Sequence, residues 1–267
     1  MSNTASSSGV MAGKKGLVMG VANERSIAWG IAAKLAEQGA ELAFTFQGEA
    51  LEKRVGPLAA SVGSDLVMPC DVTDEASIDS VFDTLKQKWG KLDFVLHAIA
   101  YSDKEELKGE YVDTSRENFT RTMDISVYSF TSIARRAAAM MPDGGSLLTL
   151  TYYGAERVMP HYNVMGVAKA ALETSIKYLA VDMGDRGIRV NAISAGPMRT
   201  LAGAVINKSR QIYNYTIDNS PIKKPLSLDD IGKSSVYLMS DLSKGVTGEI
   251  LYVDNGYNKV GMSIQDL

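Results

Sequence analysis

Segments rich in apolar residues alternate along the chain with segments whose apolar residues recur at helical spacing. Ile27, Ile31 and Leu35 fall on one face of such a helix, and Gly39 stands where that pattern ends. A longer helical pattern spans residues 162–183. The runs that are typical of buried strands lie at residues 16–20, 41–46, 65–72, 91–100, 146–151, 188–196 and 248–256.

The order of these elements predicts the fold class. Alternating strands and helices form right-handed βαβ units, whose strands join a parallel sheet that is covered by helices on both faces. We therefore predict one α/β domain with a Rossmann-like, doubly wound parallel sheet. In such a fold, ligands bind at the carboxyl ends of the strands, near the point where the strand order reverses.

Composition adds the domain limits and the expected location. A chain of 267 residues, 45% hydrophobic and 22% charged, can form one domain with a large core. We predict a disordered tail over residues 1–12 and a single dinucleotide-binding catalytic domain over residues 13–267. The first thirteen residues carry no charge and lack the apolar region of a secretory signal. No apolar run approaches the ~18 residues of a membrane span, so we expect a cytoplasmic protein without membrane insertion.

Charge and cysteine content exclude several classes of function. The chain has 28 Lys and Arg against 31 Asp and Glu, a net charge of −3, whereas nucleic-acid binders usually carry a basic excess. Cys70 is the only cysteine, so neither an internal disulfide nor a thiolate metal cluster is possible. Two histidines in addition do not suffice for a zinc site made by the protein alone, and we predict no metal site, although carboxylate sites for harder ions stay open.

The first strand ends in a loop that suits a dinucleotide without matching its usual fingerprint. Gly20 stands at the strand end and Ser26 where the helix begins, but the G-x-G-x-x-G pattern is missing. Ser26 is placed to cap that helix, whose first N–H groups would favour a pyrophosphate. A plain βα turn with a serine cap and no ligand explains the same residues, so both interpretations stay open.

The ends of the second and third strands bear on the choice of cofactor. Gln47 offers a hydrogen bond to a ribose hydroxyl but no positive charge to a 2′-phosphate, which favours NADH over NADPH. Asp71 follows the third strand, where a carboxylate can accept a hydrogen bond from an adenine amino group. Asp71 as the cap of the next helix is the alternative, and the two roles are compatible.

Tyr162 and Lys169 are seven residues apart, and seven steps of 100° end 20° short of two full turns. Both side chains therefore lie on one helix face, about 10.5 Å apart along the helix axis. A lysine ammonium beside a phenol favours the phenolate and would lower the pKa of the tyrosine. A solvated helix face explains the pair equally well.

The surrounding residues carry a resemblance. The spacing Y-x9-Y-x6-K, formed by Tyr152, Tyr162 and Lys169, and the segments NVMGVAKAALE, RVNAISAGPMRTLA and GEILYVDNG resemble the bacterial NADH-dependent enoyl-acyl-carrier-protein reductases of the short-chain dehydrogenase/reductase superfamily. The resemblance covers residues 13–258. Residues 97–100 read His-Ala-Ile-Ala where ordinary short-chain reductases have N-N-A-G, and residues 123–126 lack the catalytic asparagine of those enzymes.

The resemblance implies an activity and roles for the three residues. It implies reduction of the trans-2 double bond of enoyl-acyl-carrier-protein thioesters by NADH, the last reductive step of bacterial type II fatty acid elongation. Tyr162 would hydrogen-bond the thioester carbonyl, Lys169 would bind the nicotinamide ribose, and Tyr152 would lie beside the substrate as an acid/base residue. Tyr153 has no such role in the family, so we expect it to pack.

The resemblance also carries over the binding residues. Those expected to bind NADH are Gly20, Ser26, Ile27, Gln47, Asp71, Val72, Ile99, Lys169, Met198, Arg199, Thr200, Leu201 and Ala202. Those expected to bind substrate are Ser102, Tyr152, Tyr162, Met165, Ala202 and Ile206.

The resemblance also implies that residues 200–219 form a lid over the acyl chain. Small residues near the start of this segment suit a hinge, and its apolar residues suit a lipid-like substrate. An amphipathic surface helix is compatible with that role. The partner would be an acyl carrier protein, with Lys208, Arg210, Lys223 and Lys224 as candidate docking charges for its acidic surface, and the assembly a homotetramer. Two other functions stay open: a ketoacyl or alcohol dehydrogenase of the same superfamily, and an NADH sensor without catalysis.

Overall fold

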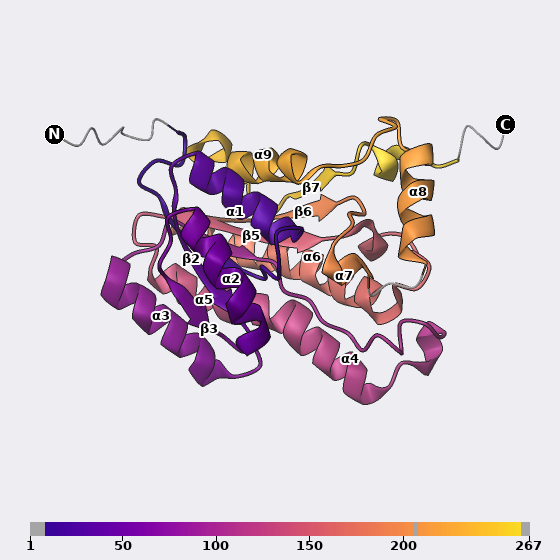
Figure 1. Cartoon of the computed structure of the whole chain (residues 1–267), viewed down its shortest axis with the longest axis horizontal. Coiled ribbons are helices and arrows are strands. Elements are labelled where there is room, and N and C mark those ends of the chain that lie inside the picture. The colour runs from indigo at the N-terminus through magenta and orange to yellow at the C-terminus, as the bar shows by residue number, and fades with distance from the viewer. Residues whose placement is uncertain (1–8, 205–207, 263–267) are drawn as a thin grey trace.

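The computed structural model describes residues 9–204 and 208–262, and of residues 202 and 204 the backbone alone. Seven parallel strands form one sheet in the order β3-β2-β1-β4-β5-β6-β7, so the strand order reverses between β1 and β4. Figure 1 shows the helices arranged around this sheet. The strands are β1 (Lys15–Met19), β2 (Glu41–Phe46), β3 (Val67–Pro69), β4 (Phe94–His97), β5 (Gly145–Thr151), β6 (Ile188–Ala195) and β7 (Ile250–Val253).

The helices cover both faces of the sheet. On one face α1, α2 and α9 pack against Val18, and on the other α3, α5 and α6 pack against Leu17 and Met19. The alternation along β1 places these neighbours on opposite faces, because successive side chains of a strand point in opposite directions. The helices are α1 (Ile27–Glu37), α2 (Glu49–Ser61), α3 (Glu75–Trp89), α4 (Arg116–Met123), α5 (Ser129–Ala139), α6 (Asn163–Gly184), α7 (Leu201–Ala204), α8 (Ser209–Asn219) and α9 (Leu228–Met239).

The predicted fold class is confirmed, but the strands β3 and β4 end earlier than predicted. The structure ends β3 at Pro69 and β4 at His97, earlier than the apolar runs do. The residues beyond these strand ends leave the sheet, and those that follow β4 line the cavity. Within the described residues, no helix is both long enough and apolar enough to cross a membrane.

The predicted tail over residues 1–12 is too long. Residues 9–12 form a turn in which Met11 is fully buried and its N–H donates to the Gln38 carbonyl at 3.0 Å. Met11 packs in the same apolar cluster as α1, so burial of its side chain stabilises this turn against the domain. Residues 1–8 lie outside the described part of the chain.

Candidate active site

The ends of β1 and β4 meet at the reversal of strand order, and Gly20 makes this contact possible. Its φ is +100°, and a Cβ at this position would lie 2.1 Å from the backbone oxygen of Ala98. Only glycine fits both the backbone angle and the contact. The loop after β1 therefore lies directly against the chain that leaves β4, and both open into the same cavity.

Ser26 is at the N-terminal boundary of α1, but its side chain does not cap the helix. Its Oγ instead accepts hydrogen bonds from the N–H groups of Ala22, at 3.0 Å, and Asn23, at 3.1 Å. The predicted cap is wrong because the Ser26 hydroxyl oxygen is hydrogen-bonded to N–H groups of the preceding loop and not to those of the helix. The result still suits a phosphate ligand: the loop is fixed, and Ile27 at the positive end of α1 lines the cavity.

Gln47 and Asp71 are brought together across the ends of β2 and β3. The Gln47 Nε2 donates to one carboxylate oxygen of Asp71 at 3.0 Å, and the backbone and hydroxyl of Thr73 donate to the other. The Thr73 hydrogen bonds, ahead of the one from Gln47, hold the pKa of Asp71 below its usual range. The helix cap of α3 is Asp74, whose side chain accepts from Ala76, so the alternative role for Asp71 is wrong.

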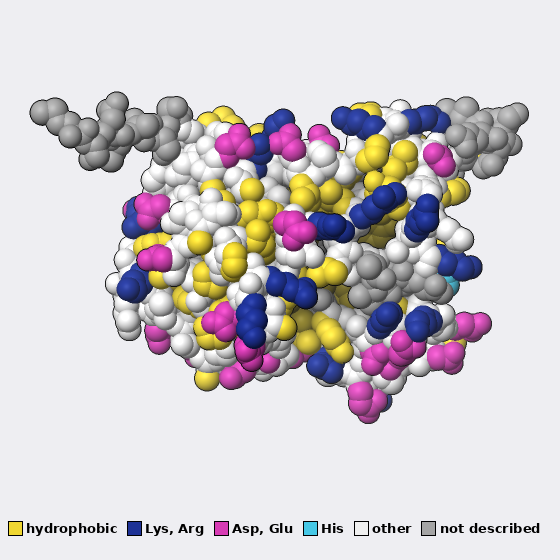
Figure 2. Space-filling view, in the orientation of Figure 1, with side chains coloured by type: hydrophobic (Ala, Val, Ile, Leu, Met, Phe, Trp, Pro, Cys, Tyr) yellow, Lys and Arg dark blue, Asp and Glu magenta, His cyan; other side chains and the backbone are white. Residues whose placement is uncertain are grey.

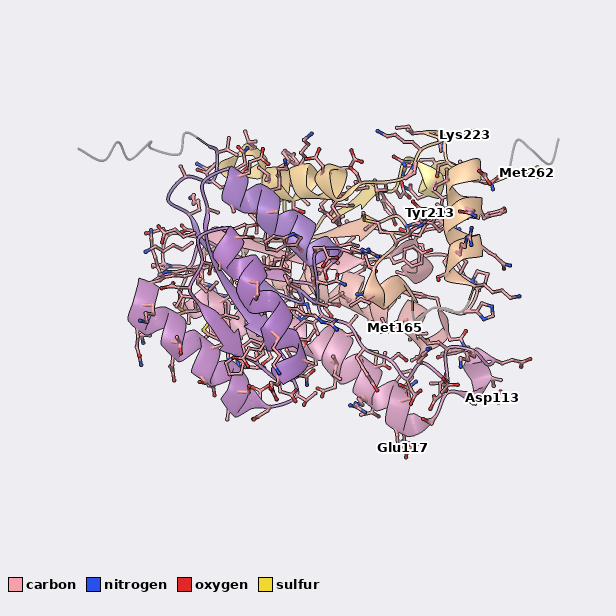
Figure 3. The ribbon with its side chains drawn as sticks, viewed as in Figure 1. Asp113, Glu117, Met165, Tyr213, Lys223 and Met262 are labelled. Carbon is pink, nitrogen blue, oxygen red and sulfur yellow. The ribbon has the colours of Figure 1, made fainter. Side chains whose placement is uncertain are left out.

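One cavity of about 1190 Å³ joins the dinucleotide end of the sheet to the tyrosines. It runs from Asn23, beside α1, to Met165 on α6. Figure 3 shows Met165 on α6 and Tyr213 on α8, two of the residues that line it. The predicted site residues that line this cavity are Ile27, Ile99, Ser102, Tyr152, Tyr162, Met165, Lys169, Met198, Arg199, Thr200 and Leu201.

The other predicted residues divide into two groups. Gly20, Ser26, Gln47, Asp71 and Val72 follow the ends of β1, β2 and β3 and are not part of the cavity wall. Ile206 lies outside the described residues, and for Ala202 only the backbone, within α7, is described.

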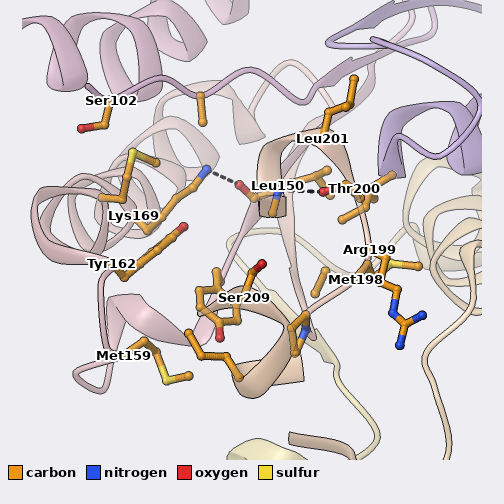
Figure 4. Close-up of a pocket in the computed structure, with 18 of the residues that line it drawn as sticks. Ser102, Leu150, Met159, Tyr162, Lys169, Met198, Arg199, Thr200, Leu201 and Ser209 are labelled. Atoms are coloured by element: carbon orange, nitrogen blue, oxygen red, sulfur yellow. Dashed lines mark hydrogen bonds between the residues drawn. The ribbon is translucent and has the colours of Figure 1, made fainter. Parts of the chain in front are cut away.

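Tyr152, Tyr162 and Lys169 all line the cavity, and Figure 4 shows Tyr162 and Lys169 side by side in its wall. Tyr152 follows β5 and Tyr162 directly precedes α6, and their rings pack edge to face with centroids 5.0 Å apart. The buried Lys169 donates from Nζ to the Leu150 carbonyl at 2.8 Å, which ties α6 to the end of β5. Figure 4 shows the Tyr162 hydroxyl and the Lys169 ammonium directed into the same part of the cavity.

The electrostatics of this cluster differ from the sequence-based expectation. Burial raises the pKa of Tyr162 above its ordinary value, and the nearby Tyr152 and Glu173 raise it further. We expected Lys169 to lower that pKa, but removal of the phenol from water sets the direction of the shift, and Lys169 is not among the groups that change it. Burial lowers the pKa of Lys169 to about 8, against the opposing charge of Glu173. At neutral pH the site therefore holds a protonated phenol, able to donate a hydrogen bond, beside a lysine that is mostly charged.

Tyr153 packs as expected. Its ring meets those of Tyr252 and Tyr257 edge to face, with centroids 6.3 and 5.9 Å apart. Tyr153 is not part of the cavity wall, so of the three tyrosines only Tyr152 and Tyr162 face the site.

His97 and Ser126 occupy the places where the chain departs from ordinary short-chain reductases. The Ser129 hydroxyl donates to the Ile125 carbonyl, so its oxygen accepts from the buried His97 Nε2 at 2.8 Å. Burial lowers the pKa of His97 to about 3, which keeps the ring neutral. Ser126 lies in a π-helical turn between α4 and α5, accepts from the Tyr101 N–H and donates to the Tyr101 carbonyl. These residues support the loop after β4.

The loop after β4 is held by a polar cluster that sequence reasoning missed. The side-chain oxygen of the buried Asn118 accepts from the Asp103 N–H at 2.9 Å, and its Nδ2 donates to Glu106 at 3.1 Å and to Ser102 at 3.2 Å. Glu106 also accepts from the N–H and hydroxyl of Ser115. Residues 102–118 show no regular apolar spacing, so only the abundance of acidic residues marks this segment in the sequence.

The same loop is tied to the start of α6 beside Tyr162. Asn163 has a φ of +39° and donates from Nδ2 to the carbonyls of Glu106, at 3.2 Å, and Gly109, at 2.9 Å. Asparagine tolerates positive φ better than most residues. The loop that carries Ser102 and the helix that follows Tyr162 are therefore one connected unit.

Replacing Asn118 with alanine is expected to raise the KM for an enoyl thioester about tenfold and to leave the NADH Kd within about twofold. Loss of the amide leaves Glu106 and the Asp103 N–H without this partner, at a cost of about 1–3 kcal/mol, and 1.4 kcal/mol is a tenfold change. Steady-state kinetics and NADH fluorescence titration measure the two constants. An equal loss in both would contradict the assignment of this cluster to the substrate side.

Comparisons with known proteins agree with this geometry. Residues 20–258 match the family model described as enoyl-(acyl carrier protein) reductase. The chain is 64% identical to enoyl-[acyl-carrier-protein] reductase [NADH] 1 of Rhizobium meliloti (strain 1021), over 98% of this chain and 96% of that one.

Two solved structures share the fold over nearly their whole length. FabI from Candidatus Liberibacter asiaticus has a TM-score of 0.94 and 57% identity, over 96% of this chain and 99% of that chain. The enoyl-(acyl-carrier-protein) reductase from Anaplasma phagocytophilum in complex with NAD has a TM-score of 0.93 and 57% identity, over 96% and 97%. The doubly wound sheet, the continuous cavity and these matches together place the chain in the enoyl-acyl-carrier-protein reductase family of short-chain oxidoreductases.

Proposed function

We propose that this chain uses NADH to reduce the trans-2 double bond of enoyl-acyl-carrier-protein thioesters, the last reductive step of fatty acid elongation. The observation that carries this proposal is the single cavity that joins Ile27 and residues 198–201 to Tyr162 and Lys169. At about 1190 Å³, this cavity is above the usual size of a small-ligand site and leaves room for the reactive ends of a cofactor and an acyl thioester. Family membership supplies the reaction class, and the cavity supplies the place where the reaction happens.

The residues at the strand ends fit NADH. The close contact at Gly20, the fixed loop before α1 and the hydrogen-bonded pair of Gln47 and Asp71 give polar, well-fixed strand ends for the adenosine and pyrophosphate. Lys169 would hold the nicotinamide ribose, and residues 198–202 would line the remaining side. Bound there, NADH supplies the hydride that C3 of the enoyl thioester receives.

Tyr162 stabilises the charge that develops on the substrate. As hydride reaches C3, electrons of the double bond move through C2 onto the thioester oxygen and form an enolate. A protonated phenol held in the cavity wall donates a hydrogen bond to that oxygen without reorganisation, and this interaction is stronger in the transition state than in the ground state. A proton then reaches C2 and gives the saturated thioester. Tyr152, in ring contact with Tyr162, lies beside the substrate as the second acid/base residue.

The test is oxidation of NADH by the purified chain in the presence of a trans-2-enoyl thioester, beside a 3-ketoacyl thioester and beside NADPH. Rapid loss of NADH absorbance with the enoyl thioester alone is the expected result. Activity with only the ketoacyl thioester would favour the dehydrogenase alternative. Binding of NADH without turnover of any thioester would favour the sensor alternative.

The proposed lid over the acyl chain consists of the loop after β6 and of α8. The Arg199 guanidinium lies over the ring of Tyr213 at 4.7 Å, which joins the loop after β6 to α8. Tyr213 and Ile212 contribute from α8 to the cavity wall. The proposed lid therefore covers residues 200–219, of which residues 205–207 lie outside the described part of the chain.

The partner is an acyl carrier protein, which docks on exposed cations beside α8. The four candidate docking cations are all exposed: Lys208, Arg210, Lys223 and Lys224. Figure 2 shows Lys and Arg side chains gathered around α8, on the right of the view. Figure 3 places Lys223 at the end of α8. Opposite charges on an acidic carrier would speed association and set its orientation.

Reversing the charges of Lys223 and Lys224, which lie outside the cavity wall, to glutamate is expected to lower kcat/KM for the carrier-protein thioester about tenfold, because a steering and docking attraction becomes a repulsion. The same variant should turn over an enoyl N-acetylcysteamine thioester within about twofold of the parent. Lys86→Glu, an exposed cation on α3, is the matched control. Equal losses on both thioesters would contradict a docking role.

We also propose a cytoplasmic homotetramer. Tyr178 and Val181 on α6 are 71% and 81% exposed, and Tyr128, in the π-helical turn, is 51% exposed. Apolar side chains gathered on neighbouring helices are typical of subunit interfaces. Light scattering of the purified chain measures the assembly, and a monomer at micromolar concentration would contradict it.

A further inference from the structure

A carboxylate lies behind the lysine of the site. Glu173 is one helical turn after Lys169 on α6 and is half-buried. Its Oε1 accepts a hydrogen bond from the Thr151 hydroxyl at 2.6 Å. Thr151 is 4% exposed and directly follows Leu150, whose carbonyl accepts from the Lys169 ammonium at 2.8 Å. Two consecutive residues of β5 are thus bound by two residues one turn apart on α6.

Few charges surround Lys169. The charge that acts on its pKa is that of Glu173, which opposes the effect of burial, and Lys169 itself acts on His97 of β4, which burial keeps neutral. Among the ion pairs within 4 Å in the described part of the chain, none joins Lys169 and Glu173. Glu173 therefore acts on Lys169 through its charge and through the shared contact with β5.

Glu173 in turn faces groups from three elements. Burial raises its pKa most, and Thr151 opposes this by its hydrogen bond. Glu156, after the turn Tyr153–Ala155, also raises that pKa, while Lys177 and Lys169 on α6 lower it. The hydroxyl of Tyr252, on β7, donates a hydrogen bond to one carboxylate oxygen of Glu156.

We propose that Glu173 is a positioning residue of the reaction: it keeps Lys169 charged in its buried place and, through Thr151, fixes the end of β5 against which Lys169 rests. This inference rests on the proposed function, in which the Lys169 ammonium holds the nicotinamide ribose. Glu173 touches neither ligand, because it is not part of the cavity wall.

The sign of the pH effect follows from the charge. A lysine is charged below its pKa and neutral above it, and the pKa of Lys169 is about 8 with Glu173 in place. Glutamine retains the size and the oxygen that accepts from Thr151 but removes the negative charge. The pKa of Lys169 then falls, so the ammonium that binds NADH is lost at a lower pH.

The experiment is a fluorescence titration of NADH binding, without acyl substrate, from pH 6.5 to 9.5. In Glu173→Gln the midpoint of the alkaline loss of affinity should move down by about one pH unit, the lower end of what one nearby opposite charge contributes. Asp182→Asn removes an exposed charge from the same helix and should leave the midpoint unchanged. Glu173→Asp keeps the charge, so its midpoint should lie close to that of the parent protein.

An unchanged midpoint in a folded Glu173→Gln variant would overturn the proposal. If that variant does not fold, Thr151→Val carries the test, because it releases the carboxylate and must move the midpoint in the same direction. Failure of the proposed function is a separate outcome: a protein that binds NADH with the expected pH shift but does not reduce enoyl thioesters would retain the role of Glu173 in cofactor binding alone.

Discussion

Replacing Tyr162 with phenylalanine is expected to lower kcat for an enoyl thioester about 10²–10³-fold, the usual effect of removing one oxyanion donor. The ring remains, so its edge-to-face contact with Tyr152 and its burial persist. The lost group is a hydrogen-bond donor that the site keeps protonated, because burial raises its pKa. The NADH Kd should stay within about twofold, since the phenol acts on substrate and not on the cofactor.

Tyr153→Phe is the matched control for this variant. It removes a phenolic hydroxyl from a tyrosine whose ring packs against Tyr252 and Tyr257 and is not part of the cavity wall. Its kcat should equal that of the parent. Stopped-flow measurement of NADH loss separates the chemical step from product release. A Tyr162→Phe variant that keeps more than a fifth of the parent rate would mean that another group carries the enolate.

Replacing Gly20 with alanine is expected to lower the free energy of unfolding by about 3 kcal/mol and to abolish measurable NADH binding. Two costs combine: a φ of +100° is unfavourable for alanine, and its Cβ would lie 2.1 Å from the backbone oxygen of Ala98. Relief of that overlap requires the loop after β1 to move away from β4. Because this movement takes place at the reversal of strand order, it deforms the cofactor site itself.

Gly63→Ala separates these two costs. Gly63 has a φ of +77°, but a Cβ at this position would have no atom within 4 Å. Only the unfavourable backbone angle then lowers the free energy of unfolding, by about 1 kcal/mol. Chemical denaturation measures both variants, and NADH titration of the folded protein measures binding. Equal destabilisation of the two variants would show that the contact with Ala98 adjusts freely, contrary to this account.

The sequence predicts the frame of the site better than its electrostatics. The glycine at the end of β1 and the tyrosine and lysine seven residues apart are local patterns, and the parallel sheet brings the segments that carry them to one edge. The sign of the pKa shift at Tyr162 is not local. It depends on burial among β5, α6 and the loop after β4, which a count of neighbouring charges in the sequence does not contain.

Short polar residues were the other source of error. Ser26 and Asp71 both stand where a helix cap is expected, but Ser26 serves the preceding loop and Asp74 caps α3. Several oxygens compete for the free N–H groups of one turn, and the three-dimensional path of the loop decides among them. The same limit hid Asn118 and Glu173, whose partners lie 12 to 22 residues away in the sequence.

The most direct test of the central claim is a single turnover with NADH that carries deuterium at both C4 positions, followed by mass spectrometry and NMR of the acyl product. The account predicts one deuterium at C3 of a saturated thioester, a solvent-derived hydrogen at C2, and slow transfer in Tyr162→Phe. An enoyl thioester recovered without deuterium, while a 3-ketoacyl thioester under the same conditions gains deuterium at its carbonyl carbon, would contradict it.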